Sequence, residues 1–312
     1  MSCTICRSKE KKKTVIFKEK MYATEELFEY QLCSNCGCLS IMNNPTDLYK
    51  YYQNYYTEDR VWNISTKKTF LKTLRIIRIK LARIPFLCKI LSTPFLDMVT
   101  YSNININSKI LDVGCGSGDL LYSFFKNGFK NLHGVDLFLQ EKYTNKGLNL
   151  EKKTIFDLNG KYDLIIFNHS FEHIWEQNET LKKAYELLNP KGTILLRIPI
   201  LNFAYEKFEN NWVQLDAPRH MYLHTANSIK ILGENNQLRL TKIIYDSTDF
   251  QFWGSMQLEK GISLSSEKSY SINNEQSIFS EKDLLKFQKE AKKLNKTKRG
   301  DQASFYFKKL VN

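Results

Sequence analysis

The sequence predicts an α/β protein in which a mostly parallel sheet is covered by helices on both faces and follows a small cysteine-rich module. From residue 109 onward, short apolar segments alternate with segments of helical pattern. Such alternation is typical of strands and helices that build a parallel sheet. Four cysteines near the N-terminus form two C-x2-C pairs, Cys3 with Cys6 and Cys33 with Cys36. This spacing is typical of a small metal-stabilised module.

The composition indicates a globular chain. Its 312 residues are 42% hydrophobic and 25% charged, with a net charge of +13, and suffice for one full core plus an appended module. No apolar run reaches the roughly eighteen residues of a membrane-spanning helix. The N-terminal sequence MSCTICRSKEKKK lacks the apolar stretch of a secretory signal. We therefore expect a cytoplasmic protein.

The two cysteine pairs predict a zinc-ribbon-like module over residues 1–45. In a reducing compartment, the seven cysteines argue against a disulfide framework. Two thiolate pairs suit one tetrahedral Zn²⁺, which would stabilise a segment too small for a core of its own. A chance pairing of cysteines is the alternative. Cys38 could substitute for one ligand, whereas Cys88 and Cys115 are expected to be small buried apolar residues.

Residues 46–100 are predicted to be a helical linker. Between Lys67 and Lys89 there are eight basic residues and no acidic one, interleaved with leucine and isoleucine. This pattern predicts a basic amphipathic helix over 67–89, which is able to lie on the inner membrane surface or meet an acidic partner. Packing of its apolar face on the rest of the protein is the alternative, and nucleic acid is a third partner for a basic stripe. Pro85 and Pro94 interrupt the helical pattern.

Residues 101–312 are predicted to form the α/β domain. Its strands are expected at 109–114, 131–136, 152–157, 162–167, 193–199, 238–245 and 302–310, and its helices at 119–128, 178–192 and 225–236. The strand at 162–167 is continuously apolar, as expected when both of its faces are covered. A polar insertion over about residues 254–300 contains an amphipathic helix at 280–295. It either covers a site or is surface decoration.

A glycine-rich loop follows the first strand in LDVGCGSGD. Gly114, Gly116 and Gly118 give the pattern D-x-G-x-G-x-G, which differs from the G-x-G-x-x-G of dinucleotide sites. This loop allows the backbone to pass close beneath a ribose and an amino-acid tail. Asp112 is expected to fix the loop or to receive an ammonium group.

Acidic residues follow the next two predicted strands. Asp136 ends the second strand, where its carboxylate can accept both ribose hydroxyls. Asp157 ends the third and is placed to reach an adenine amino group, with Leu137 and Phe156 as apolar walls. Because all of these residues stand at strand ends, where open α/β sheets bind ligands, we predict a nucleoside site there.

These motifs resemble those of the class I S-adenosylmethionine-dependent methyltransferases, over about residues 101–310. The resemblance rests on LDVGCGSGD, GVD, YDLIIFNHSFEHI and LLNPKGTILLRIP. It implies a Rossmann-like sheet of seven strands and S-adenosyl-L-methionine as the methyl donor. Asn168, which follows the fourth predicted strand, is counted among the donor contacts.

Two further segments narrow the resemblance within this family. WVQLDAPRHMYLHT and RGDQASFYFKK are similar to methyltransferases that accompany bacterial surface-polysaccharide and lipid-linked-glycan enzymes, including those of capsule synthesis. This implies methylation of a sugar hydroxyl or a phosphate-type oxygen on a glycan or nucleotide-sugar precursor. Related sugar C-methyltransferases share a cysteine module but usually have a longer C-terminal domain, so O-methylation is expected rather than C-methylation, and an amine is an alternative acceptor.

The segment NHSFEHI matches a peptidase motif by pattern. His169, Glu172 and His173 fit H-x-x-E-H, the signature of inverzincin metallopeptidases. A zinc peptidase needs both histidines on one helix and a further ligand downstream, and no motif supplies that ligand. The resemblance to methyltransferases instead implies a loop after strand four, in which Glu172 and His173 could hold Mg²⁺, as in some relatives.

The segment LDAPRHMYLH is expected to face the same crevice from the other side. His169 or His220 would act as the general base for an acceptor hydroxyl. Arg219 would bind a phosphate or carboxylate of the acceptor. The alternative is that Glu172, His173 and Arg219 belong, with Asp216, to a structural ion-pair network between loops. Two other functions remain open, a zinc-ribbon RNA methyltransferase and a non-catalytic scaffold.

Overall fold

The computed structural model describes residues 2–10, 12–43, 48–52 and 93–310, together with 75, 77–79, 81 and 84. The predicted basic helix at 67–89 therefore lies almost entirely outside the described residues, and Cys88 lies outside them too. Among the described helices, none is both long and apolar enough to cross a membrane.

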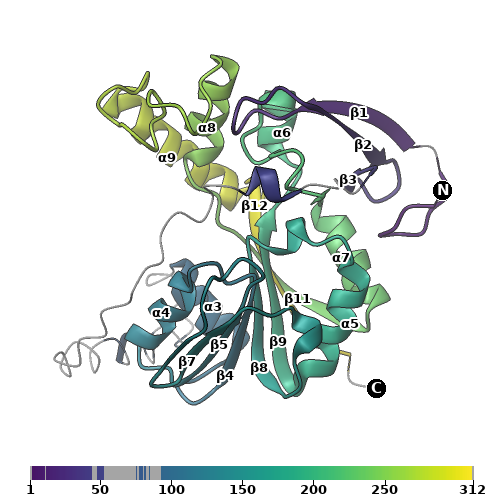
Figure 1. Ribbon diagram of the computed structural model, residues 1–312, viewed down its shortest axis with the longest axis vertical. Coiled ribbons are helices and arrows are strands. Elements are labelled where there is room, and N and C mark those ends of the chain that lie inside the picture. Colours follow the sequence, from purple (N-terminus) through teal and green to yellow (C-terminus); the bar gives the residue numbers. More distant parts are fainter. Residues whose placement is uncertain are drawn as a thin grey trace.

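The larger of two sheets has eight strands and is mostly parallel, which confirms the predicted α/β class (Figure 1). In spatial order these are β11 (Leu238–Tyr245), β12 (Gln302–Lys309), β9 (Leu188–Pro199), β8 (Tyr162–Asn168), β4 (Lys109–Val113), β5 (Asn131–Val135), β7 (Leu148–Glu151) and β6 (Tyr143–Asn145). Strands β9, β8, β4, β5 and β7 are parallel, whereas β12 and β6 run antiparallel to their neighbours. The short β6 is one strand more than the seven expected. The chain builds outward from β4 to β7 and then returns to β8, so the strand order reverses between β4 and β8. Ligands of open α/β sheets bind at such a switch point.

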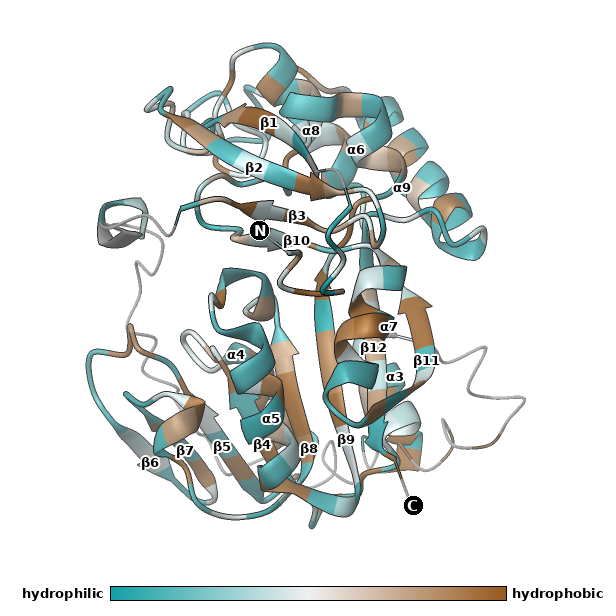
Figure 2. Cartoon of the chain, turned by 90° about the vertical axis from the view of Figure 1, so that its right-hand side faces the viewer, coloured by the Kyte–Doolittle hydropathy of each residue, from teal (hydrophilic) through white to brown (hydrophobic). Residues whose placement is uncertain are grey.

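Apolar side chains cover both faces of the sheet. Along β8, five of the seven residues are buried, and from Leu164 to Phe167 they alternate between two core clusters, as period-2 strand geometry requires. One cluster packs β8 and β9 against α5 (Gln177–Leu187) and α7 (Ala226–Asn235), and the other packs the sheet against α3 (Pro94–Ser102) and α4 (Asp119–Lys126). Figure 2 shows apolar residues along the middle of β8 and β9.

The smaller sheet combines the N-terminal segment with a strand from far along the chain. Its antiparallel order is β1 (Lys12–Lys18), β2 (Leu27–Cys33), β3 (Leu39–Ile41) and β10 (Tyr222–Leu223), and the 3-10 helix η1 (Leu48–Tyr51) follows β3 in the chain. Phe17 and Tyr30 belong to the same core cluster as β8 and α5. Both views place this sheet, with α6 (Phe203–Phe208), beyond one end of the larger sheet (Figures 1 and 2). At that end the smaller sheet contacts the loop that follows β8, because the backbone N–H of Met221, beside β10, donates to the carbonyl of Glu172.

The insertion between β11 and β12 is mainly helical. It contains α8 (Phe250–Glu259) and α9 (Glu281–Lys296), and α8 packs on α6 and on the 3-10 helix η4 (Glu209–Asn211). The sequence predicted its start at about residue 254, four residues after α8 begins. The indole N–H of Trp212, just after η4, donates to Asp301 at 2.8 Å and so ties η4 to the end of the insertion.

Three local predictions are wrong. The third strand is β7 at Leu148–Glu151, while the predicted strand 152–157 is a bend followed by the 3-10 helix η2 (Ile155–Asp157). The predicted helix 178–192 ends at Leu187, because Leu188 already pairs with β8. Pro94 does not interrupt a helix but begins α3, capped by the Thr93 hydroxyl.

Candidate active site

The glycine loop bends sharply at the carboxyl end of β4. Gly114, Gly116 and Gly118 have φ angles of +72°, +52° and +85°, a region that side chains disfavour. The N–H groups of Gly114 and Cys115 both donate to the carbonyl of Val135, which ties the loop to β5. A Cβ on Gly114 would lie 2.4 Å from the Cβ of Ser170, so the loop after β8 packs directly on this glycine.

Asp136 holds the loop from the end of β5. Its Oδ2 accepts the N–H of Gly116 at 2.9 Å, and its Oδ1 accepts the N–H of Phe138 at 2.8 Å. Each carboxylate oxygen has a second lone pair, so the two oxygens remain able to accept the hydroxyls of a ribose. The side chain is buried at the edge of the pocket that opens beside it.

This pocket lies over the carboxyl ends of β4, β5 and β8 and has a volume of about 380 Å³. Its wall includes six of the residues predicted from the sequence: Gly114, Asp136, Leu137, Phe156, His169 and His173. Leu137 and Phe156 are 58% and 49% exposed, unusual for large apolar residues, and they face the pocket as the predicted apolar walls. The size and the apolar lining are those of a small-molecule site.

Three predicted donor contacts have other partners. Asp157 lies on η2 rather than at a strand end, and its Oδ2 accepts the backbone N–H and hydroxyl of Thr154. Asn168 accepts a hydrogen bond from Arg197 at 3.1 Å. Asp112 is 2% exposed beneath the loop, where burial and then the charge of Asp136 raise its pKa to about 8. Asp157, Asn168 and Asp112 do not line this pocket.

His169 is held in the pocket wall from both sides. Its φ of +53° marks a tight turn at the end of β8, and its side chain is 36% exposed. Nε2 accepts a hydrogen bond from Arg197 at 2.9 Å, so in the neutral imidazole Nδ1 carries the proton. Nδ1 lies 3.7 Å from Oε1 of Glu172.

Glu172, on the 3-10 helix η3 (Phe171–His173), is a buried carboxylate without a hydrogen bond. It is 1% exposed, and neither of its oxygens has a hydrogen-bond partner. Burial opposes its ionisation, but the imidazoles of His169, His173 and His220 outweigh it and lower the pKa to about 2. Burial lowers the pKa of His173 and of His220 to about 4.

Arg219 does not face an acceptor, contrary to the prediction. It is 1% exposed, and its Nε and Nη2 both donate to Oδ1 of Asp216. The guanidinium also stacks over Tyr22 of the N-terminal segment. This is the structural pairing that stood as the alternative. His224 is likewise fully buried, between Ser228 and Gln177, and does not reach the rim.

Sequence reasoning missed several residues of the pocket. Tyr52, Trp175 and Met221 line it, and the Tyr52 hydroxyl lies 3.0 Å from Nδ1 of His173. Arg197 was overlooked although it orients His169 and is paired with Asp246 at 2.6 Å. An arginine within the otherwise apolar strand TILLRIP was the signal that could have found it.

The four cysteines of the two C-x2-C pairs lie together. The Sγ atoms of Cys3 and Cys36 are 3.9 Å apart, those of Cys6 and Cys33 are 3.6 Å apart, and all four lie within 4.8 Å of one another. A tetrahedral zinc with Zn–S bonds of about 2.3 Å separates its sulfur ligands by roughly 3.8 Å. The donor set therefore fits Zn²⁺. Cys38 lies outside this group, with its Sγ 3.7 Å from His224.

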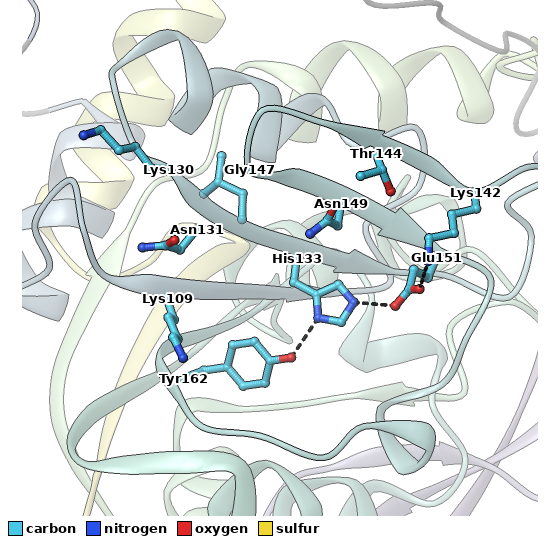
Figure 3. Close-up of a pocket in the computed structure, with 11 residues that line it drawn as sticks. Lys109, Lys130, Asn131, His133, Lys142, Thr144, Gly147, Asn149, Glu151 and Tyr162 are labelled. Carbon is cyan, nitrogen blue, oxygen red and sulfur yellow. Dashed lines mark hydrogen bonds and ion pairs between the residues drawn. The ribbon is translucent and has the colours of Figure 1, made fainter.

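A second hollow, of about 390 Å³, lies along β5 and β7 (Figure 3). In it His133 bridges the hydroxyl of Tyr162 at 2.7 Å and Oε2 of Glu151 at 3.0 Å. Lys142 and Lys153 also pair with Glu151, and Lys142 contributes most to lowering the pKa of that carboxyl to about 2. His133 thus belongs to a surface network separate from the glycine loop.

Comparison with known proteins assigns the fold. A model of the methyltransferase domain family matches residues 87–243, about half of the chain. The chain belongs to the methyltransferase domain family. Its Rossmann-like methyltransferase fold is therefore confirmed, and the family is that of S-adenosylmethionine-dependent methyltransferases. The pocket beside Asp136, which the sequence predicts to hold the methyl donor, is called the donor pocket. The likeness to glycan methyltransferases in particular stays a prediction.

Two curated relatives match part of this methyltransferase domain. Over 98 residues, the chain is 32% identical to the mitochondrial ubiquinone biosynthesis O-methyltransferase of Saccharomyces cerevisiae, covering 28% of this chain and 31% of that protein. Over 110 residues, it is 29% identical to the ubiquinone/menaquinone biosynthesis C-methyltransferase of Rickettsia typhi, covering 29% of this chain and 44% of that protein. The chain thus spans less than half the length of either relative.

Among solved structures, the chain is similar to the cyclopropane synthase MmaA2 of Mycobacterium tuberculosis. That match has a TM-score of 0.44 and 18% identity, and covers 71% of this chain and 83% of the synthase. The YcgJ protein of Bacillus subtilis matches with a TM-score of 0.46 and 13% identity, covering 70% of this chain and 98% of that protein.

Proposed function

We propose that this protein is an S-adenosylmethionine-dependent O-methyltransferase that methylates a sugar hydroxyl or phosphate-type oxygen of a surface-glycan precursor. One observation carries the chemistry: a partly exposed histidine, His169, stands in the wall of the donor pocket and is backed by a buried carboxylate. The glycan acceptor is supported by the likeness of WVQLDAPRHMYLHT and RGDQASFYFKK to glycan-modifying methyltransferases.

The reaction would be a direct displacement. The acceptor oxygen forms a bond to the methyl carbon as the carbon–sulfur bond of the donor breaks, which leaves neutral S-adenosylhomocysteine. The acceptor proton passes to Nε2 of His169 after the hydrogen bond from Arg197 to that nitrogen has broken, while Arg197 keeps its bonds to Asn168 and Asp246. Nδ1–H faces Glu172, whose negative charge stabilises the imidazolium that forms. The donor already activates the methyl group, so the protein mainly positions the acceptor and accepts its proton.

His169 is favoured over His220 as the base. His220 is 7% exposed, is not part of the pocket wall, and directs Nε2 toward Glu172 and Asp216. We therefore expect His169→Gln, whose amide can still meet Arg197, to lose turnover while it binds the donor normally. His133→Gln, in the separate network of Figure 3, is the matched control and should turn over like the natural protein. Normal turnover in His169→Gln would reject this assignment.

The acceptor is tested with labelled donor and pooled candidates. We would incubate the protein with glycan-precursor, phenolic quinone-precursor and RNA pools and identify the labelled product by mass spectrometry. The phenolic pool is included because both curated relatives are named for ubiquinone biosynthesis, and Tyr52 and Trp175 give the pocket an aromatic wall. Label in a glycan product supports the proposal, whereas label only in another pool overturns its acceptor. Absence of donor binding would favour the non-catalytic alternative.

We also infer that the four clustered cysteines hold a structural Zn²⁺. Their Sγ separations support this, and the bound metal would supply a cross-link between the segment before β1 and the end of β2. Metal analysis of the purified protein should find zinc that is lost in Cys36→Ser.

A further inference from the structure

We propose that Glu172, His173 and His220 form a second metal site, for a divalent transition ion such as Zn²⁺ or Fe²⁺, behind the wall of the donor pocket, which His173 lines. Each of the three residues offers one ligand atom, and these atoms lie within 4.8 Å of one another. Two histidines and one carboxylate are a recurring ligand set for catalytic zinc and for non-haem iron, which both leave positions open for other ligands.

The two histidines are already oriented as metal ligands. Nδ1 of His173 donates to the carbonyl of Arg219 at 2.9 Å, and Nδ1 of His220 donates to the carbonyl of Gln214 at 2.8 Å. In neutral imidazoles these bonds fix the proton on Nδ1 and leave a lone pair on Nε2. A backbone carbonyl on the far ring nitrogen is the usual support of a metal-bound histidine. The two rings stand 4.7 Å apart at 70°.

The site also contains a buried carboxyl group that accepts no hydrogen bond. Glu172 is 1% exposed, and neither of its oxygens has a hydrogen-bond partner. Arg219, the residue before His220, donates two hydrogen bonds to Asp216 and none to Glu172. A buried polar group without a hydrogen bond is unfavourable, and a bound cation would offset that cost. Among the titratable neighbours, His169 lies 3.7 Å from Oε1 of Glu172, and Asp216 lies 3.6 Å from Nε2 of His220.

The spacing is slightly wider than that of an occupied site. Nε2 of His220 and Oε1 of Glu172 are 4.0 Å apart, whereas tetrahedral ligands at about 2.0 Å from zinc lie roughly 3.3 Å apart. Small side-chain rotations would close this gap. Two imidazole nitrogens suit zinc or iron far better than Mg²⁺, which prefers oxygen ligands. The magnesium expected from the sequence therefore gives way to a transition ion.

The position of the site suggests its use. His173 lines the donor pocket, so open coordination positions of the metal would face the acceptor side of that pocket. There the ion would bind an acceptor oxygen and lower the pKa of its hydroxyl. That role rests on the proposed function, whereas the metal site itself rests only on the three side chains.

Metal content separates the two proposed sites. We would saturate the full-length protein with Zn²⁺, remove free metal, and measure bound zinc per chain in the natural protein, Glu172→Gln and His220→Gln. We expect two equivalents in the natural protein and one in each variant. Glu179→Gln, an exposed carboxylate on the first turn of α5, is the control and should keep two. With Co²⁺, the variants should keep the thiolate charge-transfer band of the cysteine site and lose only the weaker bands of the imidazole site.

Thermal melting keeps the test decisive if a variant folds poorly. In metal-free protein, Glu172→Gln replaces a buried carboxyl group that has no hydrogen bond by an amide of almost the same shape, so the melting temperature should change little, and Zn²⁺ should raise it less than in the natural protein. A single thiolate-bound equivalent in the natural protein, or two in Glu172→Gln, would overturn the site. Donor binding is measured separately without metal, so loss of the proposed function would appear there and leave the zinc count unchanged.

Discussion

Asp112 makes a sharp prediction about stability and pH. It lies beneath the glycine loop, 2% exposed, and its Oδ1 has no hydrogen-bond partner. Burial, reinforced by the charge of Asp136, raises its pKa from 3.8 to about 8. Between these values the native state holds a proton that the unfolded chain has released. Stability must therefore fall as pH rises through this window.

The size of the change in stability follows from the pKa shift of Asp112. Each pH unit inside the window changes the free energy of unfolding by about 1.4 kcal/mol, and the full window is worth on the order of 5 kcal/mol. Asp112→Asn cannot titrate and has almost the same shape. We expect the stability of this variant relative to the natural protein to rise by about 3 kcal/mol between about pH 5 and pH 7.

Urea unfolding followed by tryptophan fluorescence at several pH values measures this difference. Other titrating groups are common to both proteins and cancel in the comparison. If the difference for Asp112→Asn is independent of pH, the carboxyl is not protonated in the folded protein and the reasoning is wrong.

Four further substitutions test the framework of the site. Cys36→Ser should remove one zinc equivalent and lower the melting temperature, and an unchanged metal content would exclude Cys36 as a ligand. Gly114→Ala places a Cβ 2.4 Å from Ser170 at a positive φ, so calorimetry should find donor binding strongly weakened, and adding Ser170→Gly should restore part of it. Tyr30→Phe removes a buried hydrogen bond of 2.9 Å to the carbonyl of His220 and should cost about 1 kcal/mol in urea unfolding, and no loss of stability would mean that this bond contributes nothing. Asp136→Ala should weaken donor binding by about 1–3 kcal/mol, and unchanged affinity would remove this residue from the ribose site.

The sequence predicted the donor half of the site because that half is local. The loop from Gly114 to Gly118 and the acidic end of β5 each lie within a few residues of a strand end, so the alternation of strands and helices places them without knowledge of the rest of the fold. The apolar walls Leu137 and Phe156 followed from the same reasoning. The prediction for Asp157 was wrong because the third strand was predicted to end six residues later than it does. A Thr–Asp capping box was taken for the end of that strand.

The acceptor half depended on contacts that no local pattern reveals. Arg219 and His220 stand within two residues of Met221, which lines the pocket, yet burial against the N-terminal segment turned the arginine inward onto Asp216. Whether a charged side chain meets a ligand or an internal partner depends on which distant segment packs over it. The same limitation hid Arg197, whose partners come from the loop after β8 and the end of β11.

The pairing of β3 with β10 has a consequence for synthesis of the chain. Ser40 and Tyr222 are register partners, so the last strand of the N-terminal sheet is translated about 180 residues after the first three. At roughly 5–20 residues per second, the ribosome needs on the order of ten seconds or more to deliver it. During that interval the edge of β3 has no β10 to pair with, and the cysteine segment lacks the later part of the chain that packs on it. The proposed Zn²⁺ would therefore have this interval in which to bind the cysteines before β10 pairs with β3.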